Sequence, residues 1–94
     1  MDICAALEAT EETRAQVAGI VTAAKSDTEF PYVFVANEAG DCEIMVEPAD
    51  KSMLANCTKG VHATAIGILR WDEEAAFFED VDVNFLDDAS VVCE

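Results

Sequence analysis

In the first third of the chain, residues recur at the three- to four-residue spacing that is typical of an amphipathic helix. Between residues 10 and 25, five of them recur three or four positions apart, namely Thr13, Val17, Ile20, Val21 and Ala24. Thr10 is a suitable N-cap, and the two glutamates after it lie where the helix dipole favours negative charge. We therefore expect a helix over 10–25. Residues 2–9 either continue this helix or form a separate short one that Asp2 caps.

Gly19 is unexpected inside such a helix, because glycine there costs about 1 kcal/mol relative to alanine. We interpret it as the place where a strand approaches closely.

Residues 32–47 predict a hairpin. Residues 32–37 are rich in strand-forming side chains, and Gly40 can adopt the positive φ that the following turn requires. The second strand then alternates between two faces. Cys42, Ile44 and Val46 lie on one face, and Glu43, Met45 and Glu47 lie on the other.

After Pro48, which ends the hairpin, Asp50 can cap a short helix over 51–59. Met53, Leu54 and Cys57 share one side of that helix, and Gly60 stands where helices usually stop. Residues 60–71 are largely apolar, which predicts a strand in the centre of a sheet.

The acidic segment that follows Trp71 allows two interpretations. Asp72 can cap a helical turn, or residues 75–86 form one long strand. We favour a strand from about Phe78 onward, with Val81, Val83 and Phe85 on one face and Asp82 and Asn84 on the other. Residues 90–93 can extend the sheet.

This order of elements predicts a single α+β domain over residues 1–94. Its antiparallel β-sheet of about four to five strands carries an N-terminal helix and a short second helix packed on it. The order is similar to that of roadblock and profilin-like adaptors, whose sheets dimerise. That similarity is one of fold only, because no motif accompanies it.

The composition indicates a folded core and an extreme negative charge. The 94 residues are 52% hydrophobic with a mean hydropathy of +0.18, which is enough to build one core. The formal net charge is −15, of which −9 falls in residues 72–94, where there is no Lys or Arg. This acidity serves either solubility, as in a salty cytoplasm, or attraction of a basic protein. It disfavours direct binding to nucleic acid, because phosphates would be repelled.

The four cysteines, Cys4, Cys42, Cys57 and Cys93, are too widely spaced for a zinc or redox motif. We expect reduced thiols in a cytoplasmic protein, since the first ten residues lack the basic segment of a signal peptide. No apolar run approaches the roughly 18 residues of a membrane span, so we expect no membrane association.

Candidate chemistry is sparse. The segment 80–84, DVDVN, resembles the opening of a calcium loop, but Phe85 and Val91 stand where that loop needs Gly and Glu. His62 is the only histidine, and the scattered glycines form no phosphate loop. We expect no metal, no cofactor and no enzymatic activity.

The aromatic residues Trp71, Phe77 and Phe78 allow two interpretations. Either all three belong to the core, or one or two are exposed anchors inside an acidic rim. Two consecutive phenylalanines on a strand face opposite sides, so one of them would need a partner to cover it.

The sequence therefore predicts a non-enzymatic acidic protein that occupies a basic surface of another protein. If that surface normally binds nucleic acid, the protein acts as a nucleic-acid mimic. In size and charge it is similar to phage anti-defence and anti-CRISPR inhibitors and to nuclease immunity proteins. The predicted partner-binding residues are Asp72, Glu73, Glu74, Phe78, Glu79, Asp80, Asp82, Asp87 and Asp88. The alternative is a small dimerising adaptor, roadblock-like or profilin-like, whose acidity serves only solubility.

Overall fold

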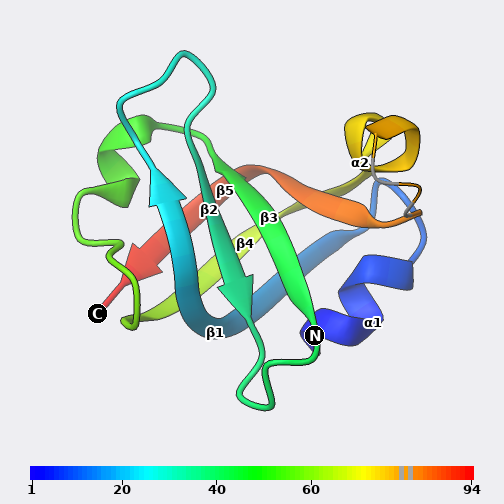
Figure 1. The fold of residues 1–94 in the computed structure, drawn as a ribbon, viewed down its shortest axis with the longest axis horizontal. Coiled ribbons are helices and arrows are strands. Elements are labelled where there is room, and N and C mark those ends of the chain that lie inside the picture. Colours follow the sequence, from blue (N-terminus) through cyan, green and yellow to red (C-terminus); the bar gives the residue numbers. More distant parts are fainter. Residues whose placement is uncertain (79, 81) are drawn as a thin grey trace.

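In the computed structural model, which describes residues 1–78, 80 and 82–94, five strands close into a barrel (Figure 1). The strands are β1 (Arg14–Lys25), β2 (Tyr32–Ala36), β3 (Glu43–Pro48), β4 (His62–Trp71) and β5 (Asn84–Cys93). Around the barrel they follow the order β1-β2-β3-β5-β4, and β4 pairs with β1 to close it. Helix α1 (Ile3–Glu8) precedes the barrel, the 3₁₀ turn η1 (Lys51–Leu54) follows β3, and helix α2 (Glu73–Phe78) lies between β4 and β5.

Four of the five strand pairs are antiparallel, and β3 pairs with β5 in parallel. This strand order, with a helical turn between β3 and β4, is that of the OB-fold barrel. The expected α+β sheet, antiparallel and open, is therefore wrong. A chain with this much strand buries its apolar faces by curling the sheet onto itself, so that the inward faces of the strands provide most of the core.

The predicted helix over 10–25 is wrong, because residues 14–25 form β1. Ala15, Val17 and Val21 point inward and alternate with exposed Arg14 and Gln16. Val17 and Val21 are four positions apart, a spacing that puts two residues on one side of either a helix or a strand. The β-branched residues favour the strand, and pairing with both β2 and β4 satisfies its backbone.

The interpretation of Gly19 as a close approach of a strand is confirmed. A Cβ atom at Gly19 would collide with the backbone carbonyl of Ala36 on β2 and contact Ile3 of α1. Around this residue β1 changes partner, since its first half pairs with β4 and its second half pairs with β2.

The hairpin, the cap at Asp50 and the strand after Gly60 are confirmed. Strands β2 and β3 pair from Val33–Val46 to Ala36–Glu43, and Gly40 has φ 76° in the turn. Asp50 accepts a hydrogen bond from Ser52 N at 2.9 Å, although the helix shortens to the turn η1. Strand β4 has neighbours on both sides, as its apolar sequence predicts.

Residues 2–9 form the separate short helix α1, which Asp2 caps through Ala5 N at 3.2 Å. Ile3 and Ala6 are fully buried in the barrel core. The end of α1 is held by Asn84, whose side-chain amide donates to Ala6 O at 3.0 Å and Ala9 O at 2.7 Å. Asn84 is therefore an internal link between α1 and β5.

The acidic segment is helical first and extended only later. Residues 73–78 form α2, and β5 begins at Asn84, so the preference for a strand from about Phe78 is wrong. Asn84 and Leu86 point inward, whereas Val83 and Phe85 are half-buried on the outside. The expected face that included Val81 lies partly outside the described residues.

All four cysteines are paired, so the prediction of reduced thiols is wrong. Cys4 bonds Cys42 and joins α1 to the start of β3, and Cys57 bonds Cys93 and joins the chain after η1 to the end of β5. Their Cα atoms are 5.3 and 5.2 Å apart. Partners 38 and 36 positions apart are brought together only by barrel closure, which local sequence patterns do not show.

Among the described residues, no helix has the length and apolar character needed to cross a membrane.

We expect Asn84→Ala to lower the free energy of unfolding by about 1–3 kcal/mol, because two carbonyls at the end of α1 would lose their donor in a buried place. Urea denaturation measures the change. Asn56→Ala is the matched control, since Asn56 is exposed after η1 and should shift stability by less than about 0.5 kcal/mol. Equal effects of the two substitutions would contradict the structural role of Asn84.

We expect reduction to lower the free energy of unfolding by about 2–5 kcal/mol per disulfide, because each bond closes a long loop. Denaturation with and without a thiol reductant measures this loss. Alkylation of the native, unreduced protein should add no label in the intact mass. Four labels without reductant would restore the prediction of free thiols.

Candidate partner-binding surface

Helix α2 exposes two adjacent phenylalanines. Phe77 is 81% exposed and Phe78 is 77% exposed, and their rings contact edge to face with centroids 4.9 Å apart. Trp71, at the end of β4, is 42% exposed and lines the same shallow hollow. These three residues form an exposed apolar surface, which we call the α2 patch. The interpretation that all three belong to the core is therefore wrong.

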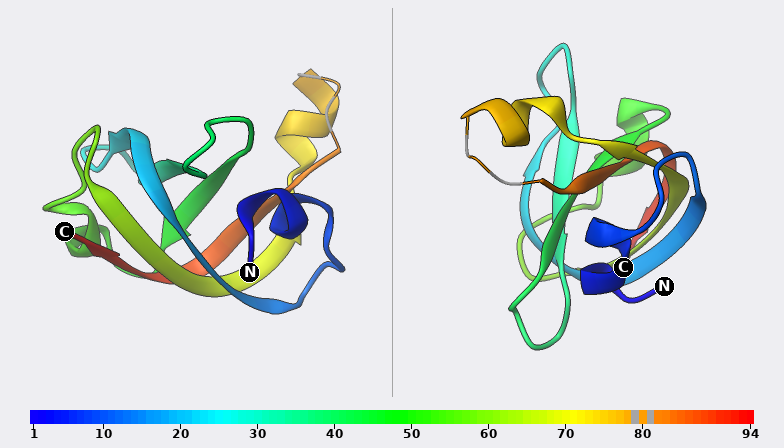
Figure 2. Two further views of the ribbon diagram at one scale, coloured as in Figure 1. Left: turned by 90° about the horizontal axis from the view of Figure 1, so that it is seen from below. Right: turned by 90° about the vertical axis from the view of Figure 1, so that its right-hand side faces the viewer.

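Local sequence explains why this segment is a helix that stands outside the core. Asp72 accepts a hydrogen bond from Ala75 N at 3.0 Å, and Glu73 and Glu74 occupy the first turn. Ala75 is the only buried residue of α2. The helix projects from the barrel between the ends of β4 and β5 (Figure 2). Because so little of it packs inward, both phenylalanine rings stay in solvent.

The predicted partner-binding residues do not share one environment. Glu73, Glu74, Phe78, Asp80, Asp82 and Asp88 are exposed. Asp72 is half-buried as the cap of α2, and Asp87 is half-buried in an ion pair. Asp80 and Asp82 precede β5, so the expectation that Asp82 lies on a strand face with Asn84 is wrong. Glu79 lies outside the described residues.

A second surface, which sequence reasoning missed, lies on the outer faces of β2, β3 and β5. Its side chains are Tyr32 and Phe34 on β2, Glu43, Met45 and Glu47 on β3, and Phe85 and Asp87 on β5. The alternation of residues in the sequence predicts three of these side chains, those of Glu43, Met45 and Glu47, on one face of β3. It could not show that aromatic residues from β2 and β5 flank this strand, because β5 joins β3 only through barrel closure.

The second surface is hollowed into a groove. One hollow reaches from Phe30 and Tyr32 to Trp71 and Phe85, and a second reaches from Phe34 to Phe78 and Val83. Both hollows are lined by Met45, Asp72 and Glu74, so they adjoin. We call the two together the groove. Helix α2 contributes residues to both parts. The other aromatic lining residues are Phe30 before β2, Tyr32 and Phe34 on β2, Trp71 at the end of β4 and Phe85 on β5.

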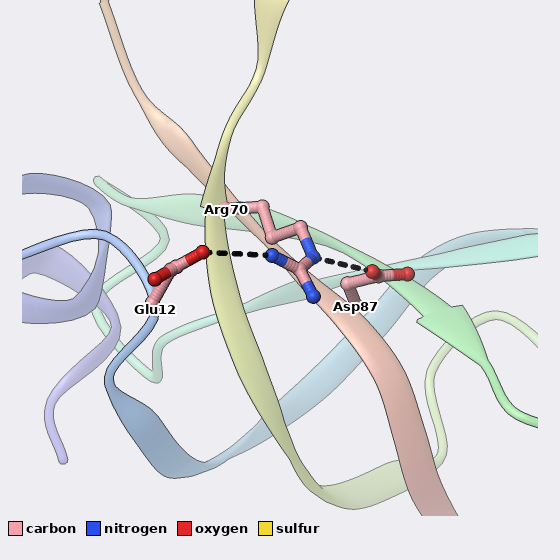
Figure 3. A network of polar contacts seen from close by, with 3 residues as sticks. All are labelled: Glu12, Arg70 and Asp87. Carbon is pink, nitrogen blue, oxygen red and sulfur yellow. Dashed lines mark hydrogen bonds and ion pairs between the residues drawn. The ribbon is translucent and has the colours of Figure 1, made fainter.

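Arg70 is the one basic side chain among the described residues that line the groove. Its Nε donates to Asp87 Oδ2 at 2.7 Å, and its Nη1 lies 3.5 Å from Glu12 Oε1 (Figure 3). The hydrogen bond to Asp87 raises the pKa of the guanidinium further above its usual range. Arg70 is therefore already occupied by two carboxylates of its own chain.

Glu47 is the most crowded carboxylate of the groove. Burial raises the pKa of Glu47 above its ordinary value, and the negative charges of Asp87, Asp72 and Glu74 raise this pKa further. Repulsion of this kind is relieved by a proton or by a cation. The groove therefore favours positive ligands.

The remaining candidates for chemistry offer little. Cys4, Asp41 and Cys42 lie close together, but both sulfurs are in a disulfide, so this cluster presents one carboxylate and no thiolate to a metal. His62 is exposed at the start of β4, and its backbone pairs with that of Glu94.

We expect Glu47→Gln to stabilise the protein at pH 7, by less than about 1 kcal/mol because solvent screens charges on a half-buried surface. A carboxyl whose pKa is raised on folding stabilises the fold when protonated, and this stability is lost as pH rises through the folded-state pKa. The difference in unfolding free energy between Glu47→Gln and the wild type should therefore grow from pH 4 to pH 7. A difference that stays constant would contradict the crowding.

No protein-family model matches the chain, and a search of curated proteins finds no similar sequence. What the protein does therefore has to be inferred from the α2 patch, the groove and their charge.

Proposed function

We propose that this protein is a non-enzymatic binding protein whose acidic surface occupies a basic surface of another protein. One observation carries the proposal, namely the exposed phenylalanine pair on α2, with Glu73, Glu74, Asp80 and Asp82 beside it in the chain and also exposed.

The α2 patch has the composition of a binding anchor. Large aromatic residues in contact with solvent are costly for a folded chain and are enriched where a partner covers them. The carboxylates around the patch would steer a basic partner toward it and speed its association. In this arrangement the rings supply most of the affinity and the charges supply selectivity and rate.

Charge supports a protein partner over a nucleic acid. Barrels with this strand order often bind oligonucleotides across β2 and β3, but Glu43 and Glu47 occupy that face here. Phosphates would be repelled by this face and by the net charge of −15. The same charges complement a protein surface that itself grips nucleic acid, so we propose nucleic-acid mimicry as the mode of action. The likeness to anti-defence and immunity proteins rests on size and charge and remains a prediction.

The dimerising adaptor remains a second proposal, with less support. Its analogy relied on an open sheet, whereas every strand of the barrel has two neighbours in the described chain, so none is free to pair with a second copy. A homodimer would have to form through the α2 patch instead. Light scattering coupled to gel filtration separates the two proposals, because a stable dimer lost on Phe78→Ser favours the adaptor.

The disulfides bear on where the protein acts. The cytoplasmic location expected from the sequence relied on reduced cysteines, but disulfides persist mainly in oxidising compartments. We therefore propose that the partner is met outside a reducing cytoplasm.

The proposed function is tested with a basic partner captured on the immobilised protein, identified by mass spectrometry and then purified. We expect Glu73→Gln, Asp80→Asn and Asp82→Asn together to slow its association and to weaken the salt dependence of that rate. Phe77→Ser with Phe78→Ser should instead speed dissociation by about tenfold or more, because it removes the anchor. Biosensor kinetics at several salt concentrations separate the two effects.

The matched control replaces Glu8, Glu38 and Glu94 by Gln, which gives the same net charge from exposed positions outside the α2 patch and the groove. This control should associate nearly as fast as the wild type. If the control and the α2 variant slow association equally, the acidity acts only through net charge. If neither α2 variant changes the kinetics, the proposed function is wrong.

A further inference from the structure

We infer that the groove binds arginine side chains from an extended, arginine-rich segment of the partner, with the guanidinium groups held between the aromatic residues of β2 and β5 and the carboxylates of β3. This inference rests on the proposed function, because it specifies which part of a basic partner the protein recognises. It adds a contact surface that adjoins the α2 patch and shares Trp71 and Phe78 with it.

The aromatic lining of the groove suits a planar cation. Tyr32 and Phe34 form an edge-to-face pair with centroids 5.4 Å apart, and Phe34 is in register with Met45 on β3. Phe85 is the neighbour of Arg70 across the β4–β5 pair. These rings are half-buried, so each holds one part against the barrel and offers another to the groove. A guanidinium stacks on such a surface more readily than an ammonium, which is compact and strongly hydrated.

The carboxylates of the groove outnumber its cations. Five acidic residues line the larger hollow, namely Glu11, Glu47, Asp72, Glu73 and Glu74, against Arg70 as the one base among the described lining residues. The charges of Asp87, Asp72 and Glu74 raise the pKa of Glu47 beyond the effect of its burial, although Asp87 is itself paired with Arg70. A guanidinium entering there would replace repulsion by charge-assisted hydrogen bonds.

Arg70 shows how this surface holds a guanidinium. It bridges Asp87 of β5 and Glu12 before β1 (Figure 3). It also lines the larger hollow, and its neighbour across the strand pair is Phe85. The bridge uses Asp87 and Glu12 and leaves Glu47 for a ligand, together with the second carboxylate oxygen of Glu43, whose Oε2 accepts a hydrogen bond from Thr22 Oγ1 at 2.7 Å. Arg70 also adds a positive charge at the edge of the groove, so its removal should strengthen binding of a cationic segment.

The shape of the groove favours an extended segment over a folded basic surface. Its lining residues come from α2 and from the outer faces of β2, β3 and β5, and α2 projects from the barrel (Figure 2). Glu43 and Glu47 are four positions apart on one strand, which corresponds to about 13 Å. In an extended peptide, arginines at every second position all point the same way, and those four positions apart match this distance. Flexible chain can follow such a recess, whereas a flat folded surface contacts only its rim.

The experiment uses two disordered peptides, one with arginine and one with lysine at every second position, and the oxidised full-length protein. Trp71 is the single tryptophan and lines the larger hollow, so its fluorescence reports binding, and calorimetry gives the stoichiometry. We expect a one-to-one complex in which the arginine peptide binds about threefold to tenfold more tightly than the lysine peptide, because only guanidinium stacks and bonds in a bidentate manner.

Matched variants separate the groove from net charge. The double variant Glu43→Gln with Glu47→Gln should bind the arginine peptide about tenfold or more weakly than the wild type. The control variant Glu38→Gln with Glu94→Gln has the same net charge and should change this affinity by less than about twofold. Tyr32→Leu should lower the affinity for the arginine peptide about threefold, so that it approaches the affinity for the lysine peptide. Arg70→Gln should bind the arginine peptide up to about fivefold more tightly. Circular dichroism checks that each variant is folded.

The outcomes are distinct for the inference and for the proposed function. Equal weakening by the two glutamate pairs, or equal affinity of the two peptides, would overturn the inference, because binding would then follow charge alone. The proposed function would still stand if the α2 variants altered binding of the captured partner. If the peptides bind the groove but the α2 variants leave the partner kinetics unchanged, the inference survives as a peptide site, and the proposed role of the α2 patch fails.

Discussion

The rest of the structure depends on the pairing of β1 with two neighbouring strands. Its first half pairs with β4 and its second half with β2, so the strand has to curve through the middle of the barrel wall. Gly19 lies at that change of partner, where any Cβ would collide with the carbonyl of Ala36. A glycine in the interior of a strand weakens it locally, but here it permits the close approach of β1 to β2 at the point where β1 changes partner. Without closure of the barrel β5 would have no contact with β3, and the groove would lose one side.

Barrel closure also explains how a chain with a net charge of −15 remains folded. Repulsion among carboxylates opposes the compact state, and it contributes, after burial, to the raised pKa of Glu47. Against it stand a core of aliphatic side chains and two disulfides that tie α1 to β3 and the chain after η1 to β5. These cross-links constrain the unfolded chain, and their effect does not depend on charge. The acidic surface is therefore compatible with a small domain, because its stability comes from elsewhere.

The two candidate surfaces differ in how the fold supports them. The α2 patch lies on a helix with a single buried residue, so its position depends on the cap at Asp72 and on the ends of β4 and β5. The groove lies mainly on paired strands of the barrel wall, and α2 contributes residues to both of its parts. A partner that used both surfaces would meet an exposed apolar anchor on α2 and a negatively charged recess beside it. Residues 72–94 carry a net charge of −9, and five of their acidic residues lie on α2 or next to it in the chain, namely Asp72, Glu73, Glu74, Asp80 and Asp82.

The sequence by itself determined the features that depend on neighbouring residues. It predicted the caps at Asp2 and Asp50, the hairpin with its turn at Gly40, the strand after Gly60 and the acidic surroundings of Phe77 and Phe78, because each depends on a few positions in a row. Only the tertiary structure decided the state of residues 14–25, since Val17 and Val21 suit either a helix or a strand until β2 and β4 supply backbone partners. Closure likewise decided the parallel β3–β5 pair, the cysteine partners and the inward position of Asn84. These contacts join residues far apart in the chain, and local periodicity carries no information about them.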